Sequence, residues 1–198
     1  MGIGLAATVI GLLADTVEVL RLGREFREYV RERRRGSKER VSLPEEQESK
    51  VRALIGGQIG SRLVDAFISY VEEGDSGPLT ALIDEVEERD PVDVAVDVIG
   101  RNPEVMYRRQ FKRDPDYIYK YAPGGLKVGE FPAVAVSVAK FLELINNLHP
   151  AAKKRVILAT PVTVGFQVGQ LVGTTAKIYP LHLVRGSGYA EVESVVRF

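Results

Sequence analysis

Residues 155–170, RVILATPVTVGFQVGQ, decide the fold of this chain. The run Arg155–Ala159 is short and almost continuously apolar, and such runs form strands in the interior of a sheet that is covered on both faces. A turn follows at Thr160–Thr163, and the next residues predict a helix from about Val164 to Gly173. A strand that leads through a tight turn into a helix is half of a Rossmann-like unit.

The segments on either side predict the rest of this unit. Phe131–Leu148 is apolar on nearly all of its helical faces, which indicates a long, well-buried helix. Strand-forming residues predict strands over Tyr117–Tyr121, Lys177–Val184 and Tyr189–Arg197. We therefore expect an α/β fold (α+β overall), in which a small, mostly parallel sheet holds Arg155–Ala159 in its interior.

The N-terminal half is expected to be mainly helical, over residues 5–35, Pro44–Glu73 and Leu79–Arg89. Pro91–Gly100 is ambiguous, because its valines alternate with other residues as in a strand, whereas its flanking proline and glycine resemble helix ends. The flanking residues favour a helix, and a strand remains the alternative. The chain is thus predicted to consist of a helical module, residues 1–110, and an α/β unit, residues 111–198.

Composition excludes several classes of site. The chain has 27 basic and 27 acidic residues, a balance that disfavours a general polyanion binder. It has no cysteine and two histidines, so neither a cofactor nor a metal is expected. No nucleophile or metal motif is recognisable, which disfavours an enzyme.

The apolar stretch Gly2–Leu13 is too short to span a bilayer, which takes roughly 20 residues. It also lacks the basic start of a signal peptide. We expect it to be part of a buried helix in a cytoplasmic protein, and membrane insertion remains the alternative.

Glycines give the helix that follows Arg155–Ala159 an unusual face. Gly165, Gly169 and Gly173 are four residues apart, and each weakens a helix by roughly 1 kcal/mol relative to alanine. Close packing of the helix on the sheet would offset this loss, and so would close approach by a ligand. Packing is the simpler of the two explanations.

The turn before this helix is the candidate ligand site. Open α/β sheets bind ligands at the carboxyl ends of their strands, and a helix N-terminus there favours a phosphate. Thr160 and Thr163 add hydroxyl groups. The basic, tyrosine-rich segment after Arg101 fits phosphate contact and base stacking, and it fits an amphipathic edge strand equally well.

Residues Val156–Gln170, Lys177–His182 and Tyr189 together resemble the end of a SAVED domain, over about residues 117–198. SAVED domains are relatives of the CARF sensors and bind cyclic oligonucleotides in CBASS and CRISPR-linked antiviral defence. The resemblance implies a cytosolic sensor or adaptor with a cyclic oligonucleotide ligand. It implies the following ligand contacts: Thr160, Pro161, Val162 and Thr163 by backbone and hydroxyl groups, Gln167 and Gln170 to base edges, and Arg113 and Lys120 to phosphate.

Only the second half of a SAVED domain is recognisable, so a complete pocket would require a homo-oligomer or a partner effector protein. The helical half is then either a diverged first sensor half or a separate module. Two alternatives remain open: a structural or oligomerisation protein without a ligand, and a membrane-active effector coupled to the sensor unit.

Overall fold

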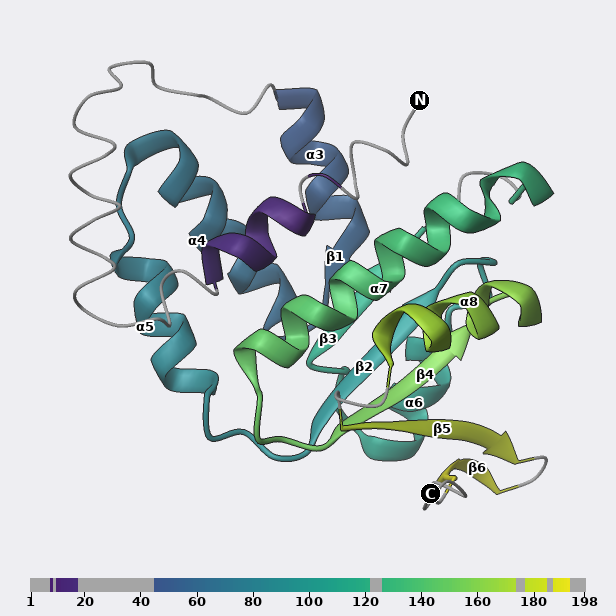
Figure 1. Ribbon diagram of the computed structural model, residues 1–198. Coiled ribbons are helices and arrows are strands. Elements are labelled where there is room, and N and C mark those ends of the chain that lie inside the picture. The colour runs from purple at the N-terminus through teal and green to yellow at the C-terminus, as the bar shows by residue number, and fades with distance from the viewer. Residues whose placement is uncertain are drawn as a thin grey trace.

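The computed structural model describes residues 8, 10–17, 45–121, 126–173, 177–184 and 187–192 (Figure 1). Over these residues the chain is an α/β protein with a six-stranded mixed sheet and helices on both of its faces, which confirms the predicted fold class.

The sheet has the strand order β1-β3-β2-β4-β5-β6. The inner strands β3, β2, β4 and β5 run parallel, and antiparallel β1 and β6 lie at the two edges. The strands are β1 (Ile55–Gly56), β2 (Val92–Asp97), β3 (Tyr117–Lys120), β4 (Lys154–Ala159), β5 (Ile178–Val184) and β6 (Gly188–Glu191). The predicted apolar strand is β4, and its interior position is confirmed.

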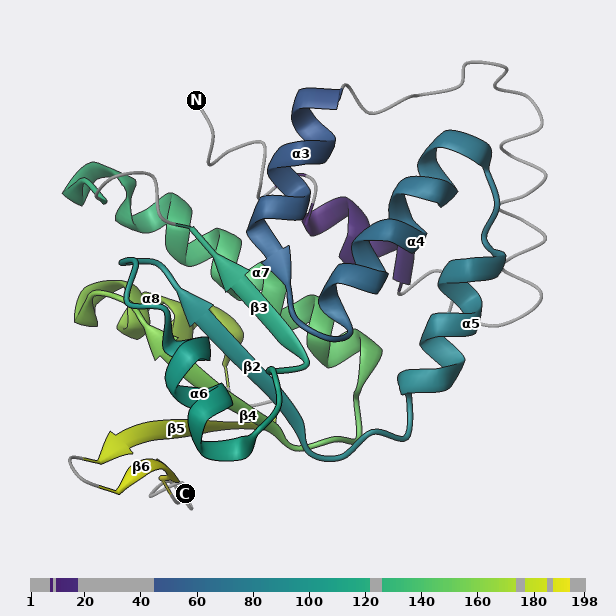
Figure 2. The same ribbon diagram turned by 180° about the vertical axis from the view of Figure 1, so that it is seen from behind.

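Helices form layers on the two faces of the sheet. Two opposite views show α7 and α8 on one face and α6 on the other (Figures 1 and 2). The remaining helices gather beside β1 and the end of α7. The helices are residues 10–17, α3 (Glu45–Leu54), α4 (Gly60–Glu73), α5 (Gly77–Val86), α6 (Pro103–Phe111), α7 (Phe131–Leu148) and α8 (Val162–Val172), with a 3-10 turn η1 (Val128–Glu130) before α7.

One core joins the helical part to the sheet. Leu13 and Val17 from the helix of residues 10–17 are fully buried in the same cluster as Phe141 of α7 and Val94 of β2. The prediction of a buried N-terminal helix is thus confirmed for residues 10–17, and the rest of the predicted helix lies outside the described residues. Within the described ranges, no helix is long and apolar enough to cross a membrane.

The prediction of a helix over Pro91–Gly100 is wrong, because this segment contains β2. The strand lies between β3 and β4, and all six of its residues are buried. Its valines face α7, while Asp93 and Asp97 face α6 and are neutralised there by arginines and by backbone N–H groups. A central strand can therefore alternate like an amphipathic one, since its polar residues are satisfied inside the protein.

The single helix predicted from Pro44 to Glu73 is also wrong, because β1 divides it into α3 and α4. Ile55 and Gly56 pair with β3. Gly57 then adopts φ +97, and an added Cβ there would lie 2.6 Å from the Asp116 carbonyl oxygen. The helix is interrupted here because the backbone at Gly57 approaches the backbone before β3 too closely for any side chain.

Other predicted elements agree with the structure. Helix α7 has the predicted bounds, β3 and β5 begin within one residue of the predicted strands, and α8 begins two residues early. The last strand is observed as Gly188–Glu191, and residues 193–198 lie outside the described part. Helix α6 was not predicted.

The glycine face of α8 does not pack on the sheet. Among the described residues, no atom lies within 4 Å of a Cβ added at Gly169, and Gly173 ends the helix with φ +66. A Cβ at Gly165 would lie 3.3 Å from the Thr160 hydroxyl oxygen. The expectation of close helix–sheet packing is therefore wrong for Gly169, whose face is open to solvent.

Candidate ligand-binding edge

The candidate site lies where β2, β3 and β4 end, at Asp97, Lys120 and Ala159, which we call the carboxyl edge. Asp97 is in register with both Lys120 and Ala159, so the three strand ends lie side by side. From this edge β2 leads through α6 to β3, and β4 leads through α8 to β5 on the other side. The strand order thus reverses between β2 and β4, at the position where open α/β sheets bind their ligands.

The loop between β2 and α6 is organised by the chain's own carboxylate. The Asp97 side chain is buried and accepts hydrogen bonds from the backbone N–H groups of Ile99 (3.2 Å), Arg101 (3.0 Å) and Asn102 (2.8 Å). These are the donors that an anionic ligand would otherwise use. This loop therefore has little capacity left for a phosphate.

The loop between β4 and α8 is different. Pro161 precedes the helix, no side chain caps it, and its first turn contains no acidic residue. The first N–H groups of a helix have no intrahelical partner, and they carry the positive end of the helix dipole. Val162 is 90% exposed and Thr163 is exposed, so the first turn of α8 lies at the surface. The N-terminus of α8 can accept an anion.

Lys120 and Glu104 lie at the same edge. Lys120 Nζ donates to Glu104 Oε1 at 2.8 Å, which joins the end of β3 to the first turn of α6. Because β2 lies between β3 and β4, Lys120 is two strand spacings, roughly 10 Å, from Ala159 and the turn that follows. The structure thus brings predicted residue Lys120 to the same edge as Thr160, Pro161, Val162 and Thr163.

The two predicted glutamines lie along α8. Gln170 is exposed, whereas Gln167 is partly buried. The Gln167 Oε1 atom is shielded from solvent and has no hydrogen-bond partner among the described residues. Gln170 is therefore open to a ligand, whereas the Gln167 amide oxygen is shielded and lacks a donor; neither residue supports the fold through a described side-chain hydrogen bond.

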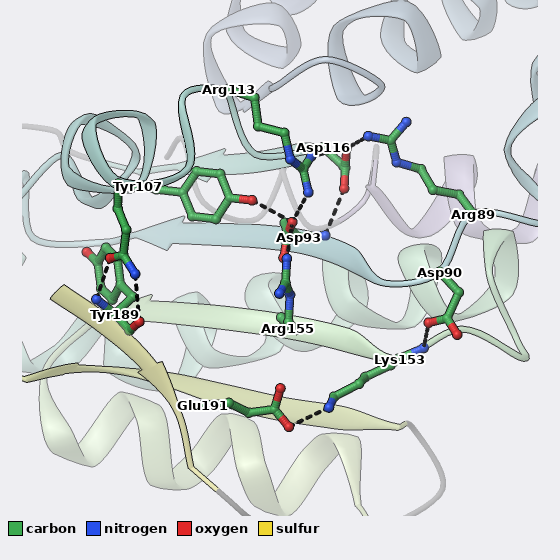
Figure 3. Close-up of polar contacts among 11 residues, drawn as sticks. Arg89, Asp90, Asp93, Tyr107, Arg113, Asp116, Lys153, Arg155, Tyr189 and Glu191 are labelled. Carbon is green, nitrogen blue, oxygen red and sulfur yellow. Dashed lines mark hydrogen bonds and ion pairs between the residues drawn. The ribbon is translucent and has the colours of Figure 1, made fainter. Parts of the chain in front are cut away.

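Arg113 lies elsewhere, at the opposite ends of the strands (Figure 3). It pairs with Asp93 and Asp116, whose side chains are fully buried. Arg155 also pairs with Asp93 through two hydrogen bonds of 2.6 and 2.7 Å, and Arg89 pairs with Asp116. The Arg113 guanidinium is thus committed to a network that ties β2, β3 and β4 together, and it is not brought together with the carboxyl edge.

This network explains the polar groups under α6. The Tyr107 hydroxyl donates to Asp93, and burial followed by this contact raises the pKa of Tyr107 above its ordinary value. Burial likewise raises the pKa of Asp116, although the Asp93 backbone N–H and the Arg89 and Arg113 guanidinium groups oppose the shift. Its buried groups are internally paired, which is typical of a structural network.

Apolar side chains are exposed around the carboxyl edge. They include Phe166 at 66% and Leu158 at 38% exposure, together with Val162, and Ile99 at 43% in the loop after β2. Bases of a nucleotide can stack or pack on such surfaces. Within the described residues, no group of three or more His, Asp or Glu side chains could hold a metal ion.

Sequence analysis did not identify Glu104 or Ile99 as site residues, because it did not predict α6. The signal was present: Asn102-Pro103-Glu104 has a proline at the first helical position and an acidic residue next to it.

A groove of about 350 Å³ lies between α4 and α5, away from the carboxyl edge, and the Arg62–Glu85 ion pair is part of its lining.

We compared the chain with protein-family models, with curated proteins and with solved structures, and none of the three comparisons gave a match.

Proposed function

We propose that this chain binds a cyclic oligonucleotide at its carboxyl edge and acts as a cytosolic sensor or adaptor in prokaryotic antiviral defence. The observation that carries the proposal is the uncapped, solvent-facing N-terminus of α8 at the position where the strand order reverses. A phosphate of the ligand binds the first N–H groups of α8, assisted by the hydroxyls of Thr160 and Thr163.

The ligand class rests on the resemblance of residues 117–198 to a SAVED domain and on the chemistry of the edge. Exposed Phe166 and Ile99 offer apolar surface to bases, and Gln167 and Gln170 offer amide groups to base edges. Lys120 is 40% exposed and contributes positive charge. Arg113 is not included, because its guanidinium is paired with two buried carboxylates.

Self-association, or docking of a partner effector protein, belongs to the same proposal. Helix α8 contains no charged residue, and its outer face presents Val162, Phe166 and Gly169 to solvent. Copies of a face without charge can meet without like-charge repulsion. A repeated, ring-shaped ligand contacts such an assembly through more than one edge.

The test is calorimetric titration with cyclic di-, tri- and tetranucleotides of adenine, guanine and uracil. The diagnostic variant is Thr163→Asp, which places a carboxylate in the first turn of α8. This variant is expected to stabilise the free protein by about 0.5–1 kcal/mol through the helix dipole. It is also expected to weaken binding at least tenfold, because the carboxylate occupies and repels the phosphate position.

The matched control is Thr80→Asp near the N-terminus of α5, which makes the same change far from the carboxyl edge. It should leave the affinity unchanged. If the wild-type protein binds none of the rings, the proposed function is wrong. If Thr163→Asp binds as tightly as wild type, the phosphate does not lie at α8.

A further inference from the structure

Glu104 has an unusual environment for a carboxylate. Its side chain is 9% exposed, and Lys120 Nζ bonds to only one of its oxygens, Oε1. The other oxygen, Oε2, is shielded from solvent and has no hydrogen-bond partner among the described residues. A buried acceptor without a donor is rare in folded proteins and destabilises them, more strongly when it is charged.

Neighbouring Asp97 shows that the edge is able to satisfy a carboxylate. Both Asp97 oxygens accept backbone N–H groups, two at Oδ1 and one at Oδ2. The first turn of α6 favours the negative charge of Glu104 through the helix dipole, but this does not supply a donor to Oε2. The missing partner therefore distinguishes Glu104 from the neighbouring carboxylate of Asp97.

The charges around Glu104 indicate what that partner is. Among the described ion pairs, Glu104 has one partner, Lys120, and Asp97 has no cationic partner. A phosphate would be repelled there, whereas an N–H or O–H donor would find an acceptor. At the carboxyl edge, the N-terminus of α8 can thus bind an anion, and Glu104 of α6 can accept a hydrogen bond from a ligand.

The strand ends beside the two groups are about one nucleotide apart. The turn after β4 and the end of β3, where Lys120 pairs with Glu104, are roughly 10 Å apart, comparable with the span from the phosphate of a nucleotide to the edge of its base. Lys120 is the more exposed member of the pair, with 40% of its side chain exposed against 9% for Glu104. A rotation of this flexible side chain uncovers the carboxylate.

We propose that Glu104 determines ligand specificity by accepting, at Oε2, a hydrogen bond from a base N–H or a ribose O–H of the nucleotide whose phosphate binds α8. This inference rests on the proposed function, because it assigns a second contact to the same ligand. The two donor sources share one chemistry, and analogues separate them.

The experiment compares wild type with Glu104→Gln, using the tightest-binding cyclic oligoadenylate or oligoguanylate of two to four residues as the probe. The amide keeps one carbonyl oxygen for Lys120 and replaces the second acceptor with a donor. Affinity is expected to fall about tenfold to hundredfold, the contribution of a charged hydrogen bond. The melting temperature of the free protein is expected to stay the same or rise, because an unsatisfied buried charge is removed.

Two analogues of the same ring identify the donor. One has unsubstituted purine in place of adenine or guanine, and the other has 2′-deoxyribose in place of ribose. The analogue that lacks the donor should bind wild type and Glu104→Gln equally, because the interaction is then already lost. Glu85→Gln, which removes a carboxylate on α5 that pairs with Arg62 of α4, is the control and should bind like wild type.

Each contrary result has a defined meaning. If Glu104→Gln binds the ring as tightly as wild type, the inference is wrong and the proposed function stands. Lower stability with unchanged affinity would reduce Glu104 to an ion-pair partner of Lys120, which also overturns the inference. If none of these rings binds wild type, the inference fails together with its premise, and the failure is visible without any variant.

Discussion

Replacing Gly169 with alanine should stabilise this protein, although glycines spaced four apart suggest a tight contact. The residue lies inside α8, and an added Cβ would meet no described atom within 4 Å. Alanine is favoured over glycine in a helix interior by about 0.8–1.0 kcal/mol. With no steric term to subtract, we expect nearly all of this gain. A chain of this length should melt about 2–4 °C higher.

The two neighbouring glycines give matched comparisons within the same helix. At Gly165 the new Cβ would lie 3.3 Å from the Thr160 hydroxyl, which must shift by a few tenths of an ångström, so the expected gain is smaller. Gly173 has φ +66, a conformation that disfavours alanine by about 1 kcal/mol or more. The expected order of stability is Gly169→Ala, Gly165→Ala, wild type, Gly173→Ala.

Urea unfolding at low micromolar protein concentration measures this series. The reasoning is refuted if Gly169→Ala is less stable than wild type. A loss of stability that grows with protein concentration would locate the reason at the outer face of α8, where another copy would then be in contact with Gly169.

Two further predictions concern buried ionisable groups. Asp93→Asn should destabilise the protein by about 3 kcal/mol in urea unfolding, because Arg113 and Arg155 lose a buried carboxylate partner. The control is Asp114→Asn, which removes one partner of an exposed ion pair and should change stability by less than about 1 kcal/mol. Burial, followed by repulsion from Lys177 and opposed by Asp90, lowers the pKa of Lys154 to about 8. The unfolded chain therefore keeps a proton that the folded protein releases between about pH 8 and the ordinary lysine pKa of 10.5, so this group makes stability rise with pH over that range. Lys154→Met should be more stable than wild type at pH 7, with a difference that shrinks by pH 10; a difference that is constant with pH would contradict the assignment.

Continuous apolar patterns predicted the fold well where burial alone decides the structure. The helix Phe131–Leu148 is an example, since half of its residues are buried, and so is the interior strand β4, whose Val156 and Ile157 are buried. Pattern analysis failed for β2, because Asp93 and Asp97 look solvent-facing and are buried. Asp93 pairs with Arg113 and Arg155, which are far along the chain, and Asp97 accepts backbone N–H groups of the loop that follows it; the alternation of residue types records neither.

The candidate site was predictable where it depends on chain order. Thr160–Thr163 follow an interior strand and begin a helix, so their place at the carboxyl edge follows from the sequence. The position of Arg113 does not follow, because its ion pairs form only when β2 and β3 lie side by side. The helix that carries Glu104 could have been predicted from Asn102-Pro103-Glu104, but the unpaired oxygen of Glu104 is a property of the packed helix and has no counterpart in the sequence.

The central position of β2 sets the order in which the nascent chain can assemble its sheet. Asp93 bonds to Asp116, 23 residues later, and to Arg155, 62 residues later. At about 5–20 residues per second, β2 and β3 leave the ribosome several seconds before β4 is complete. During that interval the side of β2 that later pairs with β4 is an open parallel edge, with Asp93 still lacking Arg155. Such an edge can pair with the wrong strand or bind a chaperone. The speed of translation between residues 97 and 154 therefore governs how long the edge of β2 stays unpaired and open to mispairing.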